Sequence, residues 1–338
     1  MIPVCEPTLH GNELKYVMEC VKSGWISSSG RFIKDFEDKF SSYCNAKYGV
    51  SCSTGTAALH LAIEALRIGK GDEVIIPTFT MIASSNAIIY AGAKPVLVDS
   101  EMNTWNIDAN KVEEKITKKT KAIMVVHTYG HPVDMDKVKR IANRYNLHII
   151  EDAAEAHGAE YKGRKVGSLG DISCFSFYAN KILTTGEGGM VVTNDKKLAE
   201  RARSLKNHFF GKIRFLHKEV GYNYRMTNVQ AALGLAQLEK IEEYVNARRK
   251  NAKRYNSLLK SVKGVTTPPE ASWAKNVYWM YGILVQNGFG LSMPQLREKL
   301  YRKGIDTRTF FIGMHKQPAY KKNDERFPDV SGDYPVSD

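Results

Sequence analysis

The sequence contains no long hydrophobic segment, although 43% of its 338 residues are hydrophobic. No apolar run approaches the roughly 20 residues that a membrane-spanning helix requires. The first residues also lack a basic segment followed by an apolar stretch, which is the pattern of a signal peptide. We therefore expect a cytoplasmic protein with no membrane partner.

Cysteine is scarce, with five residues that are scattered along the chain and never form a C-x-x-C pair. Structural zinc sites and the disulfide frameworks of small secreted domains both depend on closely spaced cysteines. The pattern therefore argues against both classes, predicts no metal site and suits a reducing compartment.

Acidic residues are in the minority, because 36 aspartates and glutamates stand against 49 lysines and arginines, giving a formal net charge of +13. Such an excess can indicate a nucleic-acid-binding protein. Here the basic residues are spread along the chain, alternate with acidic ones and accompany no DNA- or RNA-binding motif. We expect no nucleic-acid partner, since a phosphorylated cofactor or a nucleotide substrate would use only a few of these charges.

The chain shows no internal repeat and no low-complexity linker, and its first two thirds alternate short apolar segments with amphipathic ones. The expected strands are 48–51, 73–76, 95–98, 122–127, 147–150, 174–177 and 189–193. The expected helices are 11–24, 32–43, 57–66, 82–91, 111–116 and 135–146. This alternation predicts an α/β fold with a mostly parallel central sheet covered by helices.

The pattern changes after about Gly221. Residues 227–255 are expected to form one long, charged helix that bridges to a smaller C-terminal α/β domain, with a strand at 278–285 and a helix at 294–303. We expect two domains, residues 1–225 and 226–338. The last residues, 331–338, end without a helix or strand, so we expect the second domain to be incomplete.

The run from Ser176 to Gly189 is the most informative segment, because Lys181 lies there between an apolar, aromatic strand and a Thr/Gly loop. A lysine held in such a setting can be neutral near physiological pH and can attack a carbonyl carbon. Lys181 is therefore a candidate Schiff-base lysine for pyridoxal 5′-phosphate (PLP). The alternative is a solvated loop lysine, and supporting groups elsewhere must decide between the two.

The segment Ser53–Leu59 lies between an expected strand and an expected helix. It therefore follows the carboxyl end of a strand, and open parallel sheets bind ligands at these strand ends. Its small residues would let backbone N–H groups converge at the helix start, where the helix dipole favours a phosphate. The alternative is an ordinary helix cap, for which serine and threonine are preferred in any case.

Glu151 and Asp152 directly follow the expected strand 147–150. Asp152 is well placed to keep a pyridinium nitrogen protonated, which makes the ring an electron sink. A carboxylate at a strand end is also a frequent helix cap, so this reading remains open. His157 is interpreted as a packed or hydrogen-bonded neighbour and not as an acid or base.

Two further segments carry groups that can reach a phosphate. Ser176 lies on a strand five residues before Lys181, so its hydroxyl could contact a phosphate while Lys181 reaches an aldehyde carbon. Asn223 or Arg225, just before a helix, could contact the phosphate bound by a partner subunit. The alternative for this segment is a plain helix start capped by Thr227.

Together these motifs resemble the DegT/DnrJ/EryC1/StrS family of PLP-dependent sugar aminotransferases. The resemblance rests on residues 55–60, 151–158, 175–189 and 221–228, in that order, and covers nearly the whole chain. It implies a type I PLP-dependent aminotransferase fold, with PLP in the larger domain, and a homodimer whose active sites are shared between subunits. It also implies that PLP passes through pyridoxamine phosphate while L-glutamate becomes 2-oxoglutarate.

The resemblance assigns roles to individual residues of this sequence. Lys181 matches the lysine that binds PLP covalently, Asp152 the partner of the ring nitrogen, and Glu155 a position near the ring oxygen. The remaining matches are Gly55, Thr56, Ala57 and Ser176 for the phosphate, Asn223 for a contact from the neighbouring chain, and His315, Tyr281 and Trp25 for the substrate. Met81 departs from the family, since it occupies a position where many members place an aromatic ring against the cofactor.

Within the family, residues 24–28, 77–80 and 310–318 together with Tyr281 are most similar to members that convert GDP-4-keto-6-deoxy-D-mannose to GDP-perosamine for O-antigen or other polysaccharide biosynthesis. A dTDP- or UDP-linked keto sugar, and a 3-amino product, remain alternatives. A related sugar dehydratase that uses pyridoxamine phosphate would carry a histidine in place of Lys181. A regulatory or binding protein of this fold would have no need for the aligned lysine.

Overall fold

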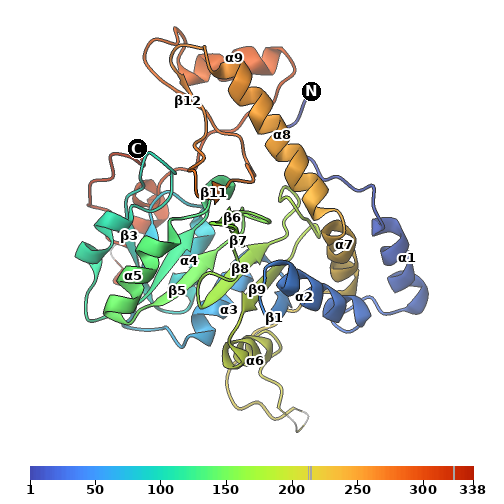
Figure 1. Cartoon of the computed structure of the whole chain (residues 1–338). Coiled ribbons are helices and arrows are strands. Elements are labelled where there is room, and N and C mark those ends of the chain that lie inside the picture. The colour runs from blue at the N-terminus through green and yellow to red at the C-terminus, as the bar shows by residue number, and fades with distance from the viewer. Residues whose placement is uncertain (212, 214, 323) are drawn as a thin grey trace.

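A computed structural model describes residues 1–211, 213, 215–322 and 324–338, and its centre is a seven-stranded sheet (Figure 1). The strands follow the order β1 (Tyr48–Cys52), β9 (Gly189–Thr193), β8 (Ile172–Ser176), β5 (His148–Asp152), β4 (Thr120–Val126), β2 (Glu73–Pro77) and β3 (Lys94–Val98). Strand β9 runs antiparallel to both neighbours, and the other pairings in this sheet are parallel. The predicted mostly parallel sheet is confirmed.

Helices cover both faces of the sheet and enclose two hydrophobic cores. One core lies under α3 (Gly55–Ala65), α4 (Ile82–Tyr90) and α6 (Lys196–Leu205), and the other under α2 (Arg31–Tyr43), α5 (Met135–Tyr145) and α7 (Asn228–Leu238). Successive residues of a strand point to opposite faces, so in β4 Met124 enters the first core and Ile123 and Val125 enter the second. Burial on both faces explains why these strands are apolar at nearly every position.

Helix α2 forms an aromatic base below the lysine segment. Phe32, Phe36 and Phe40 recur every four residues, which places them on one helix face, and all three are buried. The ring of Phe40 packs against Phe175 and Phe177, with centroid distances of 4.9 and 5.1 Å. Burial of each such ring contributes roughly 2–3 kcal/mol. This packing fixes the end of β8, from which the lysine segment departs.

Two expected helices differ in the structure. Residues 111–116 form no α-helix but two 3₁₀ turns, η1 (Ala109–Lys111) and η2 (Glu113–Lys115), because so short a segment does not offset the cost of nucleating an α-helix. Residues 227–255 form two helices, α7 and α8 (Ile241–Leu259), separated at Glu239 and Lys240. The break falls where nearly all-round burial of α7 gives way to the charged, half-exposed surface of α8.

The expected strand 278–285 is also wrong over most of its length, since only β12 (Leu284–Val285) pairs, with β10 (Val265–Thr266). The cause is a local contact, in which the N–H groups of Val277 and Trp279 donate to the carbonyls of Gly130 and Tyr129. Helix α6 was not foreseen, although Asp195 caps it by accepting hydrogen bonds from two backbone N–H groups.

Helix α8 leads to the top of Figure 1, where β12 and α9 (Met293–Arg302) lie, and β12 pairs with β10. The chain then returns to the large sheet through η4 (Met314–Lys316) and η5 (Pro318–Tyr320), and the hydroxyl of Tyr320 donates to Asn86 of α4. The remaining elements are α1 (Glu13–Ser23), the 3₁₀ turn η3 (Thr128–Gly130) and a small sheet of β6 (Glu160–Tyr161), β7 (Arg164–Lys165) and β11 (Ala274–Lys275). The division at residue 226 stays a prediction.

No helix within the described ranges combines the length and the apolar character that crossing a membrane requires. Across the same residues, no three His, Cys, Asp or Glu side chains are grouped so that they could hold a metal ion.

Candidate functional site

The carboxyl ends of the central strands bring the predicted residues together at one edge of the sheet. Strand β5 ends at Asp152 and β8 ends at Ser176, and these parallel neighbours finish at the same edge. Strand β9 begins there, because Gly189 pairs with both Cys52 and Ser176. Open parallel sheets bind ligands at this edge.

The start of α3 forms an anion cradle against Ser176. A Cβ atom on Gly55 would lie 2.6 Å from Cβ and 2.9 Å from Oγ of Ser176, so only glycine lets that hydroxyl approach the helix end. The N–H group of Ala57 donates to the capping hydroxyl of Thr54 at 3.1 Å. The N–H groups of Gly55 and Thr56 have no hydrogen-bond partner among the described residues and add to the positive end of the helix dipole. The cradle fits a phosphate.

Asp152 is buried and held by two hydrogen bonds. Its Oδ2 accepts from the Ser84 hydroxyl at 2.8 Å, and its Oδ1 accepts from the Ala154 N–H at 3.2 Å. Ser84 is held in turn by the hydroxyl of Thr80 at 3.0 Å. Burial raises the pKa of Asp152, while these bonds and the charge of Lys181 oppose the rise. The carboxylate keeps lone pairs for a pyridinium nitrogen at the ligand edge.

The amine of Lys181 lies beside the carboxylate of Glu155. The amine Nζ lies 3.9 Å from Oε1 of Glu155, whose Oε2 accepts the N–H of Tyr129 at 2.8 Å. Burial lowers the pKa of Lys181, and the carboxylates of Glu155 and Asp152 oppose the shift. Burial also raises the pKa of Glu155 to about 7. With a lowered pKa, a larger fraction of the amine is unprotonated near neutral pH and can act as a nucleophile or base.

Glu151 is adjacent to Asp152 in sequence but faces the other side of the sheet, where it accepts hydrogen bonds that stabilise the fold. Its Oε2 lies 3.0 Å from Nε2 of His127, and its oxygens also accept the N–H groups of Gly167, Leu169 and Gly170. The Nδ1 atom of His127 accepts a backbone N–H, so Nε2 carries the proton that Glu151 receives. Burial opposes ionisation, yet these donors lower the pKa of Glu151 to about 2.

This shift predicts a component of stability that depends on pH. The pKa of Glu151 is lower in the folded chain, so its contribution is complete above about pH 4.5 and is lost as pH falls toward 2. We expect it to amount to about 3 kcal/mol. Urea unfolding of wild-type and Glu151→Gln proteins from pH 7 to pH 3 measures it. The variant should be less stable at pH 7, and the difference should shrink with acid; a constant difference would contradict the assignment.

His157 is a packed residue, as the sequence predicted. It is fully buried among the rings of Phe40, Phe175 and Phe177, and neither ring nitrogen has a hydrogen-bond partner within the described ranges. Burial lowers its pKa to about 3, so the ring stays neutral.

Three of the predicted site residues are exposed. Met81 precedes α4, is 50% exposed, and its Sδ accepts the N–H of Ala83. Trp25 is 59% exposed, and Asn223 is exposed beside the hairpin that follows α6. Within the described residues, no hydrogen bond or ring contact joins any of the three to Lys181 or Asp152, so their roles stay predictions.

The other two predicted substrate residues are engaged within the chain. The hydroxyl of Tyr281 donates to Asn256 at 2.6 Å. The buried ring of His315 bridges two side chains, since Nδ1 lies 2.7 Å from the Thr78 hydroxyl and Nε2 lies 2.7 Å from Oδ1 of Asp338. Contact of either residue with a substrate also stays a prediction.

Sequence reasoning missed three residues of this site. Ser84 lies within an expected helix, where nothing marks a serine as the partner of a distant carboxylate. Tyr129 directs its N–H at Glu155 from a left-handed conformation (φ 52°), which is rare for a residue other than glycine and leaves no mark in the sequence. Trp279 places its ring 3.7 Å from Nζ of Lys181, although the two are far apart along the chain.

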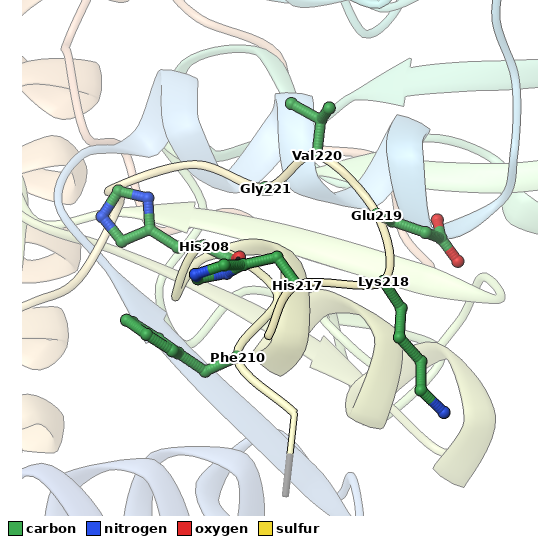
Figure 2. A pocket seen from close by; sticks show the side chains of 7 residues that line it. All are labelled: His208, Phe210, His217, Lys218, Glu219, Val220 and Gly221. Carbon is green, nitrogen blue, oxygen red and sulfur yellow. Dashed lines mark hydrogen bonds between the residues drawn. The ribbon is translucent and has the colours of Figure 1, made fainter. Parts of the chain in front are cut away.

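An open hollow of about 660 Å³ lies apart from these residues, in the hairpin after α6 (Figure 2). The ring of Phe210 contacts the rings of His208 and His217 there, while the side chains of Lys218 and Glu219 point away. Its lining includes none of the predicted site residues, although the loop continues to Asn223. The hollow is therefore part of the hairpin's own packing and not the site at the sheet edge.

The sequence model of the DegT/DnrJ/EryC1/StrS aminotransferase family matches residues 7–338. The chain belongs to this family.

The chain is also similar to individual proteins that have been named or solved. The chain is 49% identical over 321 residues to the GDP-perosamine synthase of Caulobacter vibrioides, a match that covers 94% of this chain and 86% of that protein. It is 48% identical over 328 residues to the GDP-perosamine synthase of Escherichia coli O157:H7, covering 97% and 89%. The solved structure of DesV from S. venezuelae in complex with a ketimine intermediate matches with a TM-score of 0.87 and 37% identity, covering 91% of this chain and 82% of that one.

The DegT/DnrJ/EryC1/StrS family membership settles the enzyme class, the fold class and the cofactor. The protein is a PLP-dependent aminotransferase with the type I aminotransferase fold. When bound, PLP supplies an aldehyde carbon for an amine and an electron-withdrawing ring. The cradle of Gly55 and Ser176, the buried carboxylate of Asp152 and the amine of Lys181 fit its phosphate, its ring nitrogen and its aldehyde.

Proposed function

We propose that the enzyme transfers the amino group of L-glutamate to C4 of GDP-4-keto-6-deoxy-D-mannose and forms GDP-perosamine and 2-oxoglutarate. The observation that carries the proposal is the 48–49% identity, over most of the chain, to two proteins named GDP-perosamine synthase. Lys181 supports it further, because a dehydratase of this family would carry a histidine at that position.

In this proposal Lys181 does the proton transfer in both half-reactions. Its Nζ would carry the proton between the α-carbon of the donor and C4′ of the cofactor, and would carry it in the opposite direction with the sugar. The lowered pKa of Lys181 and the adjacent Glu155 support this role, since the amine can lose and regain a proton near neutral pH. Ping-pong kinetics follow from two half-reactions at one amine.

The other side chains bind and orient. Asp152 holds the ring nitrogen, and Ser84 keeps that carboxylate directed at the ligand edge. Ser176 donates its hydroxyl to the phosphate next to the free N–H groups at the start of α3, and Gly55 leaves the space for it. These roles are supported by the convergence of the three segments at one edge of the sheet.

The proposal includes a homodimer in the cytoplasm, with Asn223 reaching the partner's site. An exposed apolar surface on α1 supports a partner subunit. Leu14 and Val21 lie seven residues apart on this helix and are 75% and 65% exposed. Apolar side chains that lie together at a surface mark interaction sites more often than free surface.

The substrate is tested by direct turnover. Purified enzyme with PLP and L-glutamate is incubated with the GDP-, dTDP- and UDP-linked 4-keto-6-deoxy sugars in parallel, and mass spectrometry detects the amino sugar. We expect turnover of the GDP-linked mannose derivative at least 100-fold above the others, since a site built to hydrogen-bond one base rejects others by roughly this factor or more.

Two other outcomes have clear meanings. Turnover of only a dTDP- or UDP-linked sugar would overturn the GDP-sugar assignment and keep the aminotransferase. Loss of a sugar hydroxyl group as water, with no nitrogen from glutamate in the product, would favour a dehydratase. NMR of the product distinguishes amination at C4 from amination at C3.

A further inference from the structure

Trp279 contacts both the reacting lysine and the residue that precedes it. Its ring centroid lies 3.7 Å from Nζ of Lys181, and its indole Nε1–H donates to the carbonyl oxygen of Asn180 at 2.8 Å. The side chain is only 5% exposed, so both contacts are shielded from water. One residue therefore holds the amine at the end of the lysine side chain and the peptide group next to its base.

We propose that Trp279 is a positioning residue for Lys181, with the indole face supporting the free amine and the indole N–H fixing the backbone that carries it. The proposal rests on the proposed function only in taking Lys181 as the reacting amine. It explains how a flexible side chain is kept beside Glu155 when it is not bound to the cofactor.

The backbone of Trp279 is itself held firmly. Its N–H donates to the carbonyl of Tyr129 at 2.9 Å, and its carbonyl accepts from Nη1 of Arg248 at 2.9 Å. Tyr129 in turn donates its N–H to Glu155, which lies beside Lys181. Lys181, Trp279, Tyr129 and Glu155 therefore form a closed circuit of contacts.

The backbone on both sides of this circuit is strained. Tyr129 and Tyr278 have φ angles of 52° and 49°, in the left-handed region that bulky residues avoid. Such conformations persist where surrounding contacts hold them, and they concentrate at functional sites. Here they turn the Tyr129 N–H toward Glu155 and set the Trp279 ring against Lys181.

The N-terminal segment provides a second, weaker hold on the same carbonyl. The thiol of Cys5 donates to the oxygen of Asn180 at 3.3 Å, and Arg248 donates to the Cys5 sulfur at 3.3 Å. The backbone carbonyl oxygen of Asn180 thus accepts hydrogen bonds from both Cys5 and Trp279. Loss of the indole N–H alone should loosen the lysine segment without releasing it.

The ring has a consequence for the charge of Lys181. A cation is attracted to the face of an indole, so the ring favours the ammonium form. The other groups that face the amine are the carboxylates of Glu155 and Asp152, the thiol of Cys5 and the neutral imidazole of His157. Replacement of the indole by leucine leaves these groups unchanged and keeps the amine covered by an apolar side chain. The burial that lowers the pKa of Lys181 is then retained while the attraction of the ring is lost, so Lys181 should lose its proton at lower pH.

The test is a titration of Lys181 in the full chain freed of PLP. An amine-reactive reagent is added at a series of pH values, and mass spectrometry follows labelling at this lysine. In Trp279→Leu protein we expect the midpoint to fall by about one pH unit, the size of a shielded cation–π contact. In Trp279→Phe protein, which keeps an aromatic face, the fall should be less than half of that.

A matched control is Trp273→Leu, because Trp273 is also a packed tryptophan but lies against Tyr161 and His131, away from the lysine. We expect no shift of the Lys181 midpoint in this variant. Thermal unfolding of each protein confirms that the comparison is made between folded chains.

A second readout separates the indole N–H from the ring. With PLP bound, Trp279→Phe should slow the half-reaction with L-glutamate about fivefold to tenfold, as expected for one lost hydrogen bond, with KM for glutamate little changed. A wild-type midpoint in folded Trp279→Leu protein, together with a wild-type half-reaction in Trp279→Phe protein, would overturn the proposal. Should the leucine variant not fold, the phenylalanine variant decides by its half-reaction. The labelling uses no sugar, so an error in the proposed substrate would leave its result unaffected.

Discussion

Replacing Lys181 by alanine is expected to lower transamination by about 10⁴-fold or more, because the change removes both the covalent anchor for PLP and the group that moves the proton. Wild-type protein should be yellow and should change its absorption on addition of L-glutamate, whereas the variant should show neither the wild-type spectrum nor its rapid change. Stopped-flow absorbance with glutamate alone measures the loss without any sugar substrate.

The matched control is Lys206→Ala. Lys206 is also a largely buried, paired lysine, with Nζ 2.9 Å from Glu37 and 2.7 Å from the carbonyl of Ser51, but it lies outside the site. Breaking such a pair costs roughly 3–5 kcal/mol of stability. The fraction of Lys206→Ala protein that remains folded should retain wild-type transamination activity. Wild-type rates in colourless Lys181→Ala protein would refute the assignment of Lys181.

The fold could be predicted largely from the sequence because its strands are buried on both faces and its helices are amphipathic. Every expected strand of the large sheet is present, from residues 48–51 to 189–193. Prediction failed where a distant contact overrides local pattern. Residues 278–281 look like a strand, but the carbonyls of Gly130 and Tyr129 accept the N–H groups of Val277 and Trp279 and turn the backbone away from strand pairing.

The site could be predicted where it lies at strand ends and not elsewhere. Lys181, Asp152 and Ser176 each follow or end a strand, and the parallel order of the sheet brings them together. Tyr129 and Trp279 depend on positive φ angles at Tyr129 and at the residue before Trp279. Tertiary contacts impose those angles, and a tyrosine in the sequence gives no indication that its φ angle is positive.

The neighbouring carboxylates of Asp152 and Glu151 are expected to serve different purposes, one in catalysis and the other in the stability of the fold. Asp152 and Glu151 are neighbours on β5, yet Asp152 faces the ligand edge with Ser84 and Glu151 faces His127 on the opposite side. Sequence alone presented them as a pair. The structure gives them different partners, so the same substitution at the two positions should have opposite consequences.

Asp152→Asn should lower the glutamate half-reaction by about 10³-fold, because a neutral amide cannot hold the ring nitrogen protonated and the ring then withdraws fewer electrons. The side chain keeps its shape and can still accept from Ser84, so unfolding in urea should change by no more than about 1 kcal/mol. Binding of PLP, followed by its absorbance, should persist.

Glu151→Gln should do the reverse, since its amide would meet three backbone N–H donors that now point at a carboxylate. We expect a loss of roughly 3 kcal/mol in stability, with near wild-type turnover in the fraction that remains folded. Measuring both variants by urea unfolding and by the glutamate half-reaction gives a two-by-two comparison. If Asp152→Asn reacted at the wild-type rate while Glu151→Gln was inactive though folded, the roles would be exchanged. The expected pattern instead follows from the alternation of a strand, which directs one carboxylate to the ligand edge and the next to the opposite side of the sheet.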